Sequence, residues 1–397
     1  MIDDIDHYSP YDPQILLGRF HRRCRTFDNI VAITGSAGKT STTRLIGAVL
    51  KTQGPTHVGS GLNISKFIIK RFARMNPLVR NWVQEVSGHA AEPMRDALDF
   101  IAPTISVVTN VGFDHNDGIR TRDDIARSKG QIVEVLPEDG IAILNADDER
   151  VLAMRERCRG KTITYGRSSA ADVRCTGWQE GLPDRLSLTV SAGGANIDVH
   201  TRMIGEKWIP NILAAMACAH GLAIPLEQAA TAIASVEPEN NKDSVHEKDG
   251  ITFVLDAYKG SFWTVPASLD IVAKAKATRR VVILGSFTYV PDDLDDILIE
   301  ATDLATKSAD QVVWYGPHGQ HVAELGPKCM DKVPVFSKIT DLVRFLDETL
   351  TAGDLVYIKS SKRDHLDRVW HRLNGGISCY RDQCGVTREC RRCRLLR

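Results

Sequence analysis

The sequence of 397 residues lacks a net charge, a long apolar run and an internal repeat. Fifty Lys and Arg residues balance fifty Asp and Glu residues, so no overall field attracts nucleic acid or a membrane surface. No apolar run approaches the roughly 20 residues that a membrane-spanning helix needs. The acidic start at residues 1–6 is not followed by the apolar core of a signal peptide. These absences predict a soluble, cytoplasmic protein with no membrane or nucleic-acid partner.

Cysteine is also sparse over most of the chain. Five of the nine cysteines are scattered singly, as reduced thiols usually are: Cys24, Cys158, Cys175, Cys218 and Cys329. This spacing gives no sign of a disulfide framework. The other four cysteines lie in the last nineteen residues.

The composition is that of an ordinary globular protein, with 43% hydrophobic and 25% charged residues. At about 150 residues per domain, this length predicts two or three domains. Residues 1–28 are rich in arginine but have little apolar periodicity, and we interpret them as a lead-in. Three further parts are predicted: a central ATP-binding domain at 29–240, a smaller C-terminal domain at 241–376, and a Cys-rich tail at 377–397.

Buried strands alternate with amphipathic helices through the central domain, which predicts a mainly parallel sheet covered on both faces. Strands are expected at 30–34, 82–86, 104–109 and 140–144, and helices at 39–51, 92–100 and 121–136. Residues 161–201 hold short β-rich runs and Gly193-Gly194, which predict an antiparallel flap. A helical pair is expected at 209–236.

The polar segment 237–250 predicts a domain boundary. Beyond it, strands at 252–256, 280–284, 311–315 and 355–358 alternate with helices. The fold class is therefore α/β: a domain with a phosphate-binding loop and a mainly parallel sheet, followed by a smaller Rossmann-like α/β domain and a short Cys-rich tail.

The strongest motif is Thr34-Gly35-Ser36-Ala37-Gly38-Lys39-Thr40-Ser41, between a predicted strand and a predicted helix. The glycines let backbone N–H groups approach an anion, and the new helix adds its partial positive charge. Lys39 is expected to reach the outer phosphates and Thr40 to hold Mg²⁺. The first glycine of the general G-x-x-x-x-G-K-[ST] pattern would fall at Ile33, so the loop is a shortened variant.

This shortened loop resembles that of the Mur ligase family, most closely its D-alanyl-D-alanine-adding branch. The resemblance continues in the same order over about 180 residues, through Glu85, Asn110 with His115, Lys129, the segment 144–148 and Asn211. It implies a chain built on the central and C-terminal domains of such a ligase. No complete N-terminal UDP-sugar-binding domain is expected to fit in residues 1–28.

The resemblance also implies roles for individual residues. Lys39, His115 and Lys129 would be catalytic, and Thr40, Glu85 and His115 would arrange Mg²⁺ around the ATP phosphates. Lys129 resembles a lysine that many family members carry as a carbamate. Asn211 would contact adenine, or serve as a helix cap instead. The nucleotide would be bound by Gly35, Ser36, Ala37, Gly38, Lys39, Thr40, Ser41, Asn211, Asp256 and Lys259.

The implied reaction forms an amide from a carboxylate and an amine, through an acyl-phosphate, with release of ADP and phosphate. The partners are small molecules: a small or carrier-linked carboxylate and an amino acid or another amine. Two alternatives stay open, a ligase that uses ammonia from a glutaminase partner and a non-catalytic ATP-binding module. The chain departs from the family at residues 237–243, where a nucleotide-contacting arginine usually follows Pro-Gly.

The tail cysteines Cys379, Cys384, Cys390 and Cys393 have the spacing C-x₄-C-x₅-C-x₂-C. Four thiolates would close a tetrahedral Zn²⁺ site, and neighbouring arginines would lower their pKa values. A redox or iron–sulfur arrangement and a flexible thiol-rich tail remain alternatives. A tail of this kind would suit a protein or carrier partner.

Overall fold

Two separate sheets organise the chain in the computed structural model. The structure describes residues 12–61, 63–87, 94–112, 121–288, 293–326 and 333–375, and single positions 379, 381, 384, 386, 390 and 393. The first compact unit contains residues 1–179, 187–201 and 207–236, and the second contains residues 180–186, 202–206 and 237–397. The unit boundary after Val236 lies in front of the predicted polar boundary segment, and the boundary between residues 240 and 241 stays a prediction.

The sheet of the first unit has the order β2-β3-β1-β4-β5-β6-β7-β8-β9 among the described residues. Its strands are β1 (Asn29–Thr34), β2 (Thr56–Gly59), β3 (Asn81–Glu85), β4 (Ile105–Val108), β5 (Ile141–Asn145), β6 (Lys161–Gly166), β7 (Val173–Gly181), β8 (Asp184–Ala192) and β9 (Ala195–His200). The helices are α1 (Pro13–Arg23), α2 (Lys39–Lys51), α3 (Ser65–Phe72), α4 (Met94–Ile101), α5 (Arg122–Glu134), α6 (Glu149–Leu152), α7 (Ile209–Gly221) and α8 (Leu226–Ala234).

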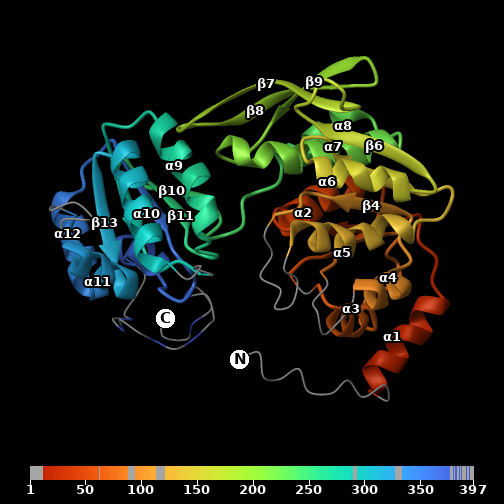
Figure 1. Ribbon diagram of the computed structural model, residues 1–397, viewed down its shortest axis with the longest axis horizontal. Coiled ribbons are helices and arrows are strands. Elements are labelled where there is room, and N and C mark those ends of the chain that lie inside the picture. Colours follow the sequence, from red (N-terminus) through yellow and green to blue (C-terminus); the bar gives the residue numbers. More distant parts are fainter. Residues whose placement is uncertain are drawn as a thin grey trace. The chain divides into compact units, whose positions relative to one another are not determined.

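Strand β1 lies between β3 and β4 and is parallel to both. Its residues 30–34 are all buried, because helices cover both faces of a parallel sheet. Helix α2 packs against α7 and β3, while α5 packs against β4 and β1 (Figure 1). The predicted α/β class and mainly parallel sheet are confirmed.

Residues 161–201 differ in part from the predicted antiparallel flap. Strand β6 is parallel to both β5 and β7, so the prediction is wrong for β6. The pairing of β8 with β9 is antiparallel, as predicted for this segment. Tyr165 of β6 is buried, and its hydroxyl donates to the Val108 carbonyl oxygen (3.2 Å). A short apolar run does not reveal which neighbour a strand joins, and here β6 continues the core sheet.

The arginine-rich segment before β1 contains α1, which packs against α3. Asp12 caps the helix through Gln14 N and pairs with Lys70 (2.6 Å), and Ile15 is buried. Arg22 donates to the carbonyl oxygens of Phe100 and Ile101, at the end of α4. A guanidinium is a favourable partner for the carbonyls at a helix C-terminus. The segment therefore folds onto the first unit.

The sheet of the second unit has the order β10-β11-β15-β12-β13-β14 among the described residues. Only β10 is antiparallel to its neighbour in these pairings. The strands are β10 (Ser244–Lys248), β11 (Ile251–Asp256), β12 (Arg279–Leu284), β13 (Gln311–Tyr315), β14 (Val335–Phe336) and β15 (Asp354–Lys359). The helices are α9 (Val265–Lys274), α10 (Leu294–Ser308), α11 (Gly316–Leu325), α12 (Ile339–Thr349) and α13 (Asp367–Leu373).

Every residue of the central strand β15 is buried, and separate apolar clusters cover the two faces of this sheet. The polar segment 237–250 was predicted only as a boundary, but it contains β10. Ser244–Lys248 carries little apolar signal and is ordered by pairing with β11. No helix within the described ranges combines the length and the hydropathy needed to cross a bilayer.

His57 on β2 gives the first unit a predicted pH dependence. Burial, with Arg71 and Arg25 nearby, lowers the pKa of His57 from 6.5 to about 4. The stability linked to the neutral ring is therefore fully present above pH 6.5 and is lost as the pH falls through about 4. His57→Gln should lose less stability than the wild type between pH 7 and 4, by about 2–3 kcal/mol.

Hydrogen exchange of β2 and β3 during urea unfolding, at both pH values, measures this difference. His200→Gln, at an exposed position on β9, is the control. An equal loss of stability in the wild type and in His57→Gln would contradict the prediction.

Candidate active site

Several polar side chains follow the carboxyl ends of β1, β3 and β4. These neighbouring strands are parallel, so their carboxyl ends meet at one edge of the sheet. The turn at residues 35–38 follows β1, Glu85 ends β3, and Thr109 and Asn110 follow β4. The sequence motifs that are far apart along the chain thus reach the same edge.

The turn has a backbone that only glycine adopts easily at two positions. Gly35 has φ +148° and Gly38 has φ +80°. A Cβ at Gly35 would lie 1.8 Å from Thr109 Oγ1, and one at Gly38 would lie 2.4 Å from Asn211 Nδ2. Side chains therefore press against the loop at both glycines, and larger residues would distort it.

Hydrogen bonds from the two residues after β4 hold the middle of the turn. Asn110 Oδ1 accepts from Ala37 N (2.8 Å), and the Asn110 carbonyl oxygen accepts from Ser36 N (3.1 Å). Thr109 Oγ1 donates to the Ala37 carbonyl oxygen (2.6 Å). These hydrogen bonds tie the turn after β1 to the loop after β4.

Helix α2 begins directly after the turn, with Gly38 as its N-cap and no side-chain cap hydrogen bond. The first N–H groups of a helix have no partner within the helix, and they carry its partial positive charge. Lys39 adds its ammonium, which donates to the Gly35 carbonyl oxygen (2.6 Å). This end of α2 has the chemistry of an anion site.

Glu85 is buried beside the start of α2 and is held by several donors. Its Oε2 accepts from Thr40 Oγ1 (2.8 Å) and Gly61 N (3.1 Å), and its Oε1 accepts from Asn63 Nδ2 (2.9 Å). Thr40 and Glu85 were both predicted site residues, and the structure brings them together. Asn63 was missed because no spacing rule connects it to the phosphate loop.

The segment 144–148 supports the loop after β4. Asn145 Nδ2 donates to the Thr109 carbonyl oxygen (2.8 Å), and Asp148 Oδ2 accepts from Val111 N (2.8 Å). Asp148 also caps α6. The sequence resemblance singled out this segment without assigning it a role. Its hydrogen bonds show that it holds the loop after β4 in place.

Asn211 lies near the start of α7 but does not cap that helix. The N-cap is Trp208, which makes no side-chain cap hydrogen bond. The buried Asn211 amide donates instead to the Gly38 carbonyl oxygen (3.0 Å) and Thr42 Oγ1 (2.9 Å). The interpretation as a helix cap is wrong, because tertiary packing turns this side chain toward the phosphate loop.

Lys129 and His115 complete the residues expected in the first unit. Lys129 is buried on α5, which packs against β4 and β1. His115 lies outside the described residues. The catalytic roles of both residues stay predictions.

In the second unit, Asp256 ends β11 and joins a buried polar network. Its Oδ2 accepts from Lys359 Nζ (2.5 Å) and Ser268 Oγ (3.2 Å), and Tyr357 OH lies 3.4 Å away. Tyr357 OH also donates to Asp243 Oδ1 (2.8 Å). Burial, together with these two carboxylates, raises the pKa of Tyr357. The network fixes the end of β11, whereas a ribose contact by Asp256 stays a prediction.

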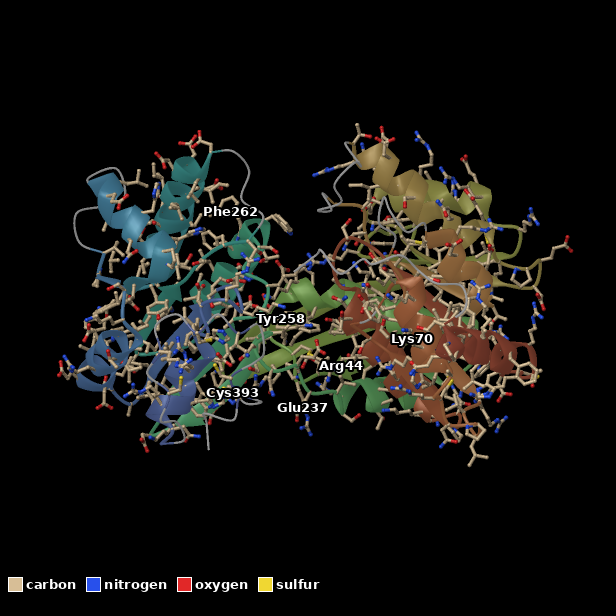
Figure 2. All side chains as sticks on the ribbon, turned by 90° about the horizontal axis from the view of Figure 1, so that it is seen from below. Arg44, Lys70, Glu237, Tyr258, Phe262 and Cys393 are labelled. Atoms are coloured by element: carbon tan, nitrogen blue, oxygen red, sulfur yellow. The ribbon has the colours of Figure 1, made fainter. Side chains whose placement is uncertain are left out.

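The loop after β11 carries a half-buried tyrosine, Tyr258, and an exposed lysine, Lys259. Lys259 is exposed, and its backbone forms an isolated bridge with Ser361. Tyr258, labelled in Figure 2, lies under two ammonium groups: Lys242 Nζ is 4.6 Å and Lys362 Nζ 5.8 Å from its ring centroid. The loop is therefore a basic surface of the second unit, in keeping with a role toward an anion.

The tail cysteines do not form the predicted four-sulfur cluster among the described residues. Cys379, Cys384, Cys390 and Cys393 are free, and no described metal-ligating group contains more than one of them. The predicted lowering of thiol pKa values by arginines is wrong for Cys390. Burial raises the pKa of the Cys390 thiol more than the nearby Arg368 lowers it.

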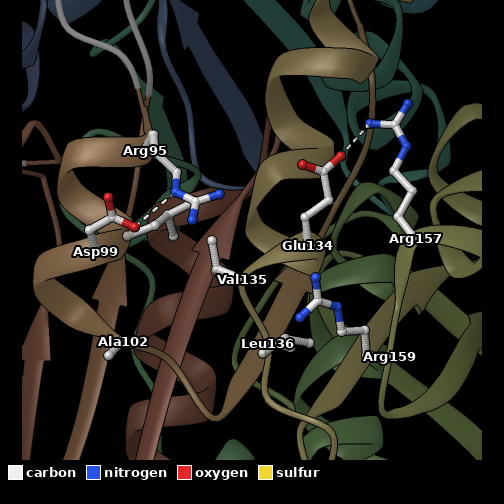
Figure 3. Close-up of a pocket in the computed structure, with 9 residues that line it drawn as sticks. Arg95, Asp99, Ala102, Glu134, Val135, Leu136, Arg157 and Arg159 are labelled. Carbon is white, nitrogen blue, oxygen red and sulfur yellow. Dashed lines mark hydrogen bonds and ion pairs between the residues drawn. The ribbon is translucent and has the colours of Figure 1, made fainter.

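A cavity of about 590 Å³ lies elsewhere on the first unit, and Figure 3 shows its lining. Ala102, Leu136 and Arg159 come shortly before β4, β5 and β6, so the cavity lies at the amino ends of these strands. Two ion pairs border it, Arg95–Asp99 and Arg157–Glu134. It is therefore separate from the phosphate loop, which follows a carboxyl end.

Comparison with known proteins matches residues 33–219 to the Mur ligase middle domain. A UDP-N-acetylmuramoyl-tripeptide--D-alanyl-D-alanine ligase of Mycobacterium tuberculosis is 30% identical over 277 residues, which are 66% of this chain and 53% of that protein. The enzyme of that name in Bacillus subtilis is 26% identical over 348 residues, 86% of this chain and 74% of that protein. The chain spans about half the length of the first of these relatives.

Solved structures show the same fold. MurF from Acinetobacter baumannii has a TM-score of 0.82 at 20% identity, covering 91% of this chain and 81% of that chain. The MurF ligase of Thermotoga maritima in complex with ADP has a TM-score of 0.77 at 19% identity, covering 92% and 83%. These similarities extend over both units of the chain, and at this level of identity they establish the fold alone.

Proposed function

The chain belongs to the Mur ligase family, and from this premise we propose that it is an ATP-dependent ligase joining a carboxylate to an amine. The observation that supports the proposal most directly is the hydrogen bond between Thr40 and the buried Glu85, next to Lys39 at the start of α2. A loop that only binds phosphate needs no buried carboxylate beside the start of α2. A site for a metal–phosphate complex needs such a carboxylate, because it supplies an oxygen ligand to the metal.

The side chains of Thr40 and Glu85 offer ligand atoms that fit Mg²⁺. Thr40 supplies a hydroxyl and Glu85 a carboxylate, and hard Mg²⁺ prefers oxygen ligands. His115 belongs to the proposed set through the family resemblance. When bound, Mg²⁺ supplies positive charge that offsets the charge on the phosphates.

In the proposed reaction, a substrate carboxylate oxygen attacks the γ-phosphorus of ATP, and the bond to the β–γ bridging oxygen breaks to release ADP. The amine nitrogen then attacks the acyl carbon of the acyl-phosphate. The C–N bond forms, phosphate leaves, and the amine proton passes to solvent. The N–H groups at the start of α2 and the Lys39 ammonium would stabilise the phosphate charge throughout.

The remaining residues have supporting roles in the proposal. Lys129 would act as a carbamate, which turns a buried cation into an anion. Asp256 would bind the ribose, and Lys259 would reach the phosphates. The exposed position of Lys259 supports this role.

Both substrates belong to the proposal. The relatives are named as ligases that act with D-alanyl-D-alanine, so we propose an amino acid or a short peptide-like amine as the acceptor. The carboxylate is proposed to be small or carrier-linked. We also propose a cytoplasmic location, as predicted from the sequence.

Incubation of the full chain with Mg²⁺-ATP and pooled carboxylates and amines tests the function. ADP and phosphate release are followed together with mass spectrometry for a condensed product. Substrate-dependent ADP with an amide mass is the expected result. AMP and pyrophosphate would overturn the acyl-phosphate route, and activity only with glutamine and an added glutaminase would favour the ammonia-using alternative.

Asn211→Ala separates two roles of that residue. Loss of the donor to Gly38 and Thr42 should loosen the loop and weaken binding of ATP and GTP by a similar factor, on the order of 10-fold. If Asn211 contacts adenine directly, Asn211→Ala should instead weaken ATP binding more than GTP binding. Calorimetric titration with both nucleotides measures the ratio, with Asn196→Ala on the exposed end of β9 as the control.

A further inference from the structure

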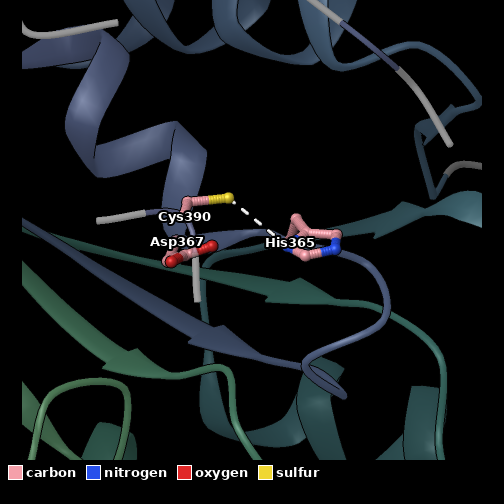
Figure 4. A group of neighbouring side chains, drawn as sticks. All are labelled: His365, Asp367 and Cys390. Atoms are coloured by element: carbon pink, nitrogen blue, oxygen red, sulfur yellow. Dashed lines mark hydrogen bonds between the residues drawn. The ribbon is translucent and has the colours of Figure 1, made fainter. Parts of the chain in front are cut away.

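Three buried side chains of different chemistry meet where the Cys-rich tail contacts the second unit. His365 lies in the loop between β15 and α13, Asp367 begins α13, and Cys390 belongs to the tail. One ligand atom from each lies within 4.8 Å of the other two, and Cys390 Sγ is 3.3 Å from His365 Nδ1. Figure 4 shows the thiol pointing toward the imidazole ring.

The hydrogen bonds of His365 define which ring nitrogen carries a proton. Its Nε2 lies 2.7 Å from the Val386 carbonyl oxygen, which can only accept. Nε2 therefore carries the hydrogen, and the Nδ1 lone pair faces Cys390. Metal-bound histidines have this arrangement, with one nitrogen on the metal and the other donating to a carbonyl or carboxylate.

The neighbouring residues hold the group in place. Asn241 Nδ2 donates to Asp367 Oδ2 (3.3 Å), which orients the carboxylate. The buried Arg368 donates through Nε to the His365 carbonyl oxygen (3.1 Å) and through Nη1 to the Arg381 carbonyl oxygen. One guanidinium thus ties the loop to the tail. The backbone of His365 has φ +53°, a strained conformation for a residue other than glycine.

We propose that His365, Asp367 and Cys390 bind one Zn²⁺ ion that fastens the tail to the rest of the second unit. A thiolate, an imidazole and a carboxylate are the ligands that zinc uses in proteins, whereas Mg²⁺ and Ca²⁺ avoid thiolates. Binding releases the thiol proton to solvent as the Zn–S bond forms. The resulting thiolate and carboxylate then balance the charge of the ion in a buried place.

This site differs from the zinc cluster expected from the cysteine spacing. It uses one tail cysteine, His365 of the loop before α13 and Asp367 at the start of α13, and no cysteine motif includes the last two. It is also independent of the ligase reaction, so its failure would leave the proposed function unchanged.

Zinc content of the dialysed full chain is the first measurement, by plasma mass spectrometry. About one Zn²⁺ per chain is expected in the wild type, with a loss in both Cys390→Ser and His365→Gln. Cys379→Ser and Cys393→Ser are matched controls, and they should keep the metal. Circular dichroism checks that each variant is folded.

Cobalt substitution gives a second readout that does not depend on stability. Co²⁺ bound to a thiolate absorbs in the near ultraviolet, so this band should appear in the wild type and in Cys393→Ser. It should be absent in Cys390→Ser and altered in His365→Gln. A wild type without bound zinc or a cobalt band would overturn the proposal. Loss of metal in Cys379→Ser and Cys393→Ser with retention in His365→Gln would also overturn it, in favour of a four-cysteine tail.

Discussion

Lys39→Ala should reduce substrate-dependent ADP release by roughly 100-fold to 1,000-fold, the usual effect of removing one preorganised donor to a transition-state charge. Lys39 is the side-chain cation of the phosphate loop, and its Nζ lies 2.6 Å from the Gly35 carbonyl oxygen. The backbone N–H groups at the start of α2 remain in the variant, so nucleotide binding should fall less than turnover. Coupled ADP assays and nucleotide titration measure the two effects separately.

Lys51→Ala is the matched control for this prediction. Lys51 is exposed at the opposite end of the same helix α2, so its loss removes an equal charge far from the loop. Equal turnover in the wild type and in Lys39→Ala would refute the assignment of the active site. A folded Lys39→Ala that fails to bind nucleotide at all would show that the lysine serves binding more than catalysis.

The largest stability effect is expected in the second unit, for Asp256→Asn. The Asp256–Lys359 ion pair is one of the most buried pairs described, with 12% of the Asp256 side chain and 4% of the Lys359 side chain exposed. The substitution therefore leaves the Lys359 ammonium buried without its anionic partner. Breaking a buried pair by removing one member usually costs about 3–5 kcal/mol. Hydrogen exchange of β11 and β15 during urea unfolding reports on this unit alone.

A second variant decides whether the buried charge causes the loss. In Asp256→Asn with Lys359→Met, no unpaired ammonium remains, so the double variant should be more stable than Asp256→Asn. Asp303→Asn is the surface control, because the Asp303–Lys307 pair on α10 is exposed and surface pairs contribute little. A double variant less stable than the single one would show that hydrogen bonding, rather than charge, dominates at Asp256.

Several helices and strands could be predicted from the sequence because the signals that specify them are local. The predicted helix 39–51 agrees with α2, and the predicted strand 311–315 agrees with β13. The glycine turn, the lysine and the threonine were found together because a phosphate loop is one contiguous segment. Strands with weak apolar signals, such as β2, β7, β10 and β14, were missed, since pairing with neighbours orders them.

The sequence by itself determined the α/β class, the phosphate loop between a strand and a helix, and the order of the motifs along the chain. These properties follow from apolar periodicity and from glycine and lysine at short spacing, which act over a few residues. Only the tertiary structure decided that β6 is parallel to β5, that Asn211 holds the phosphate loop, and that Cys390 meets His365 and Asp367. Each of these depends on segments that are remote in sequence, and their contacts are set by how buried surfaces pack together.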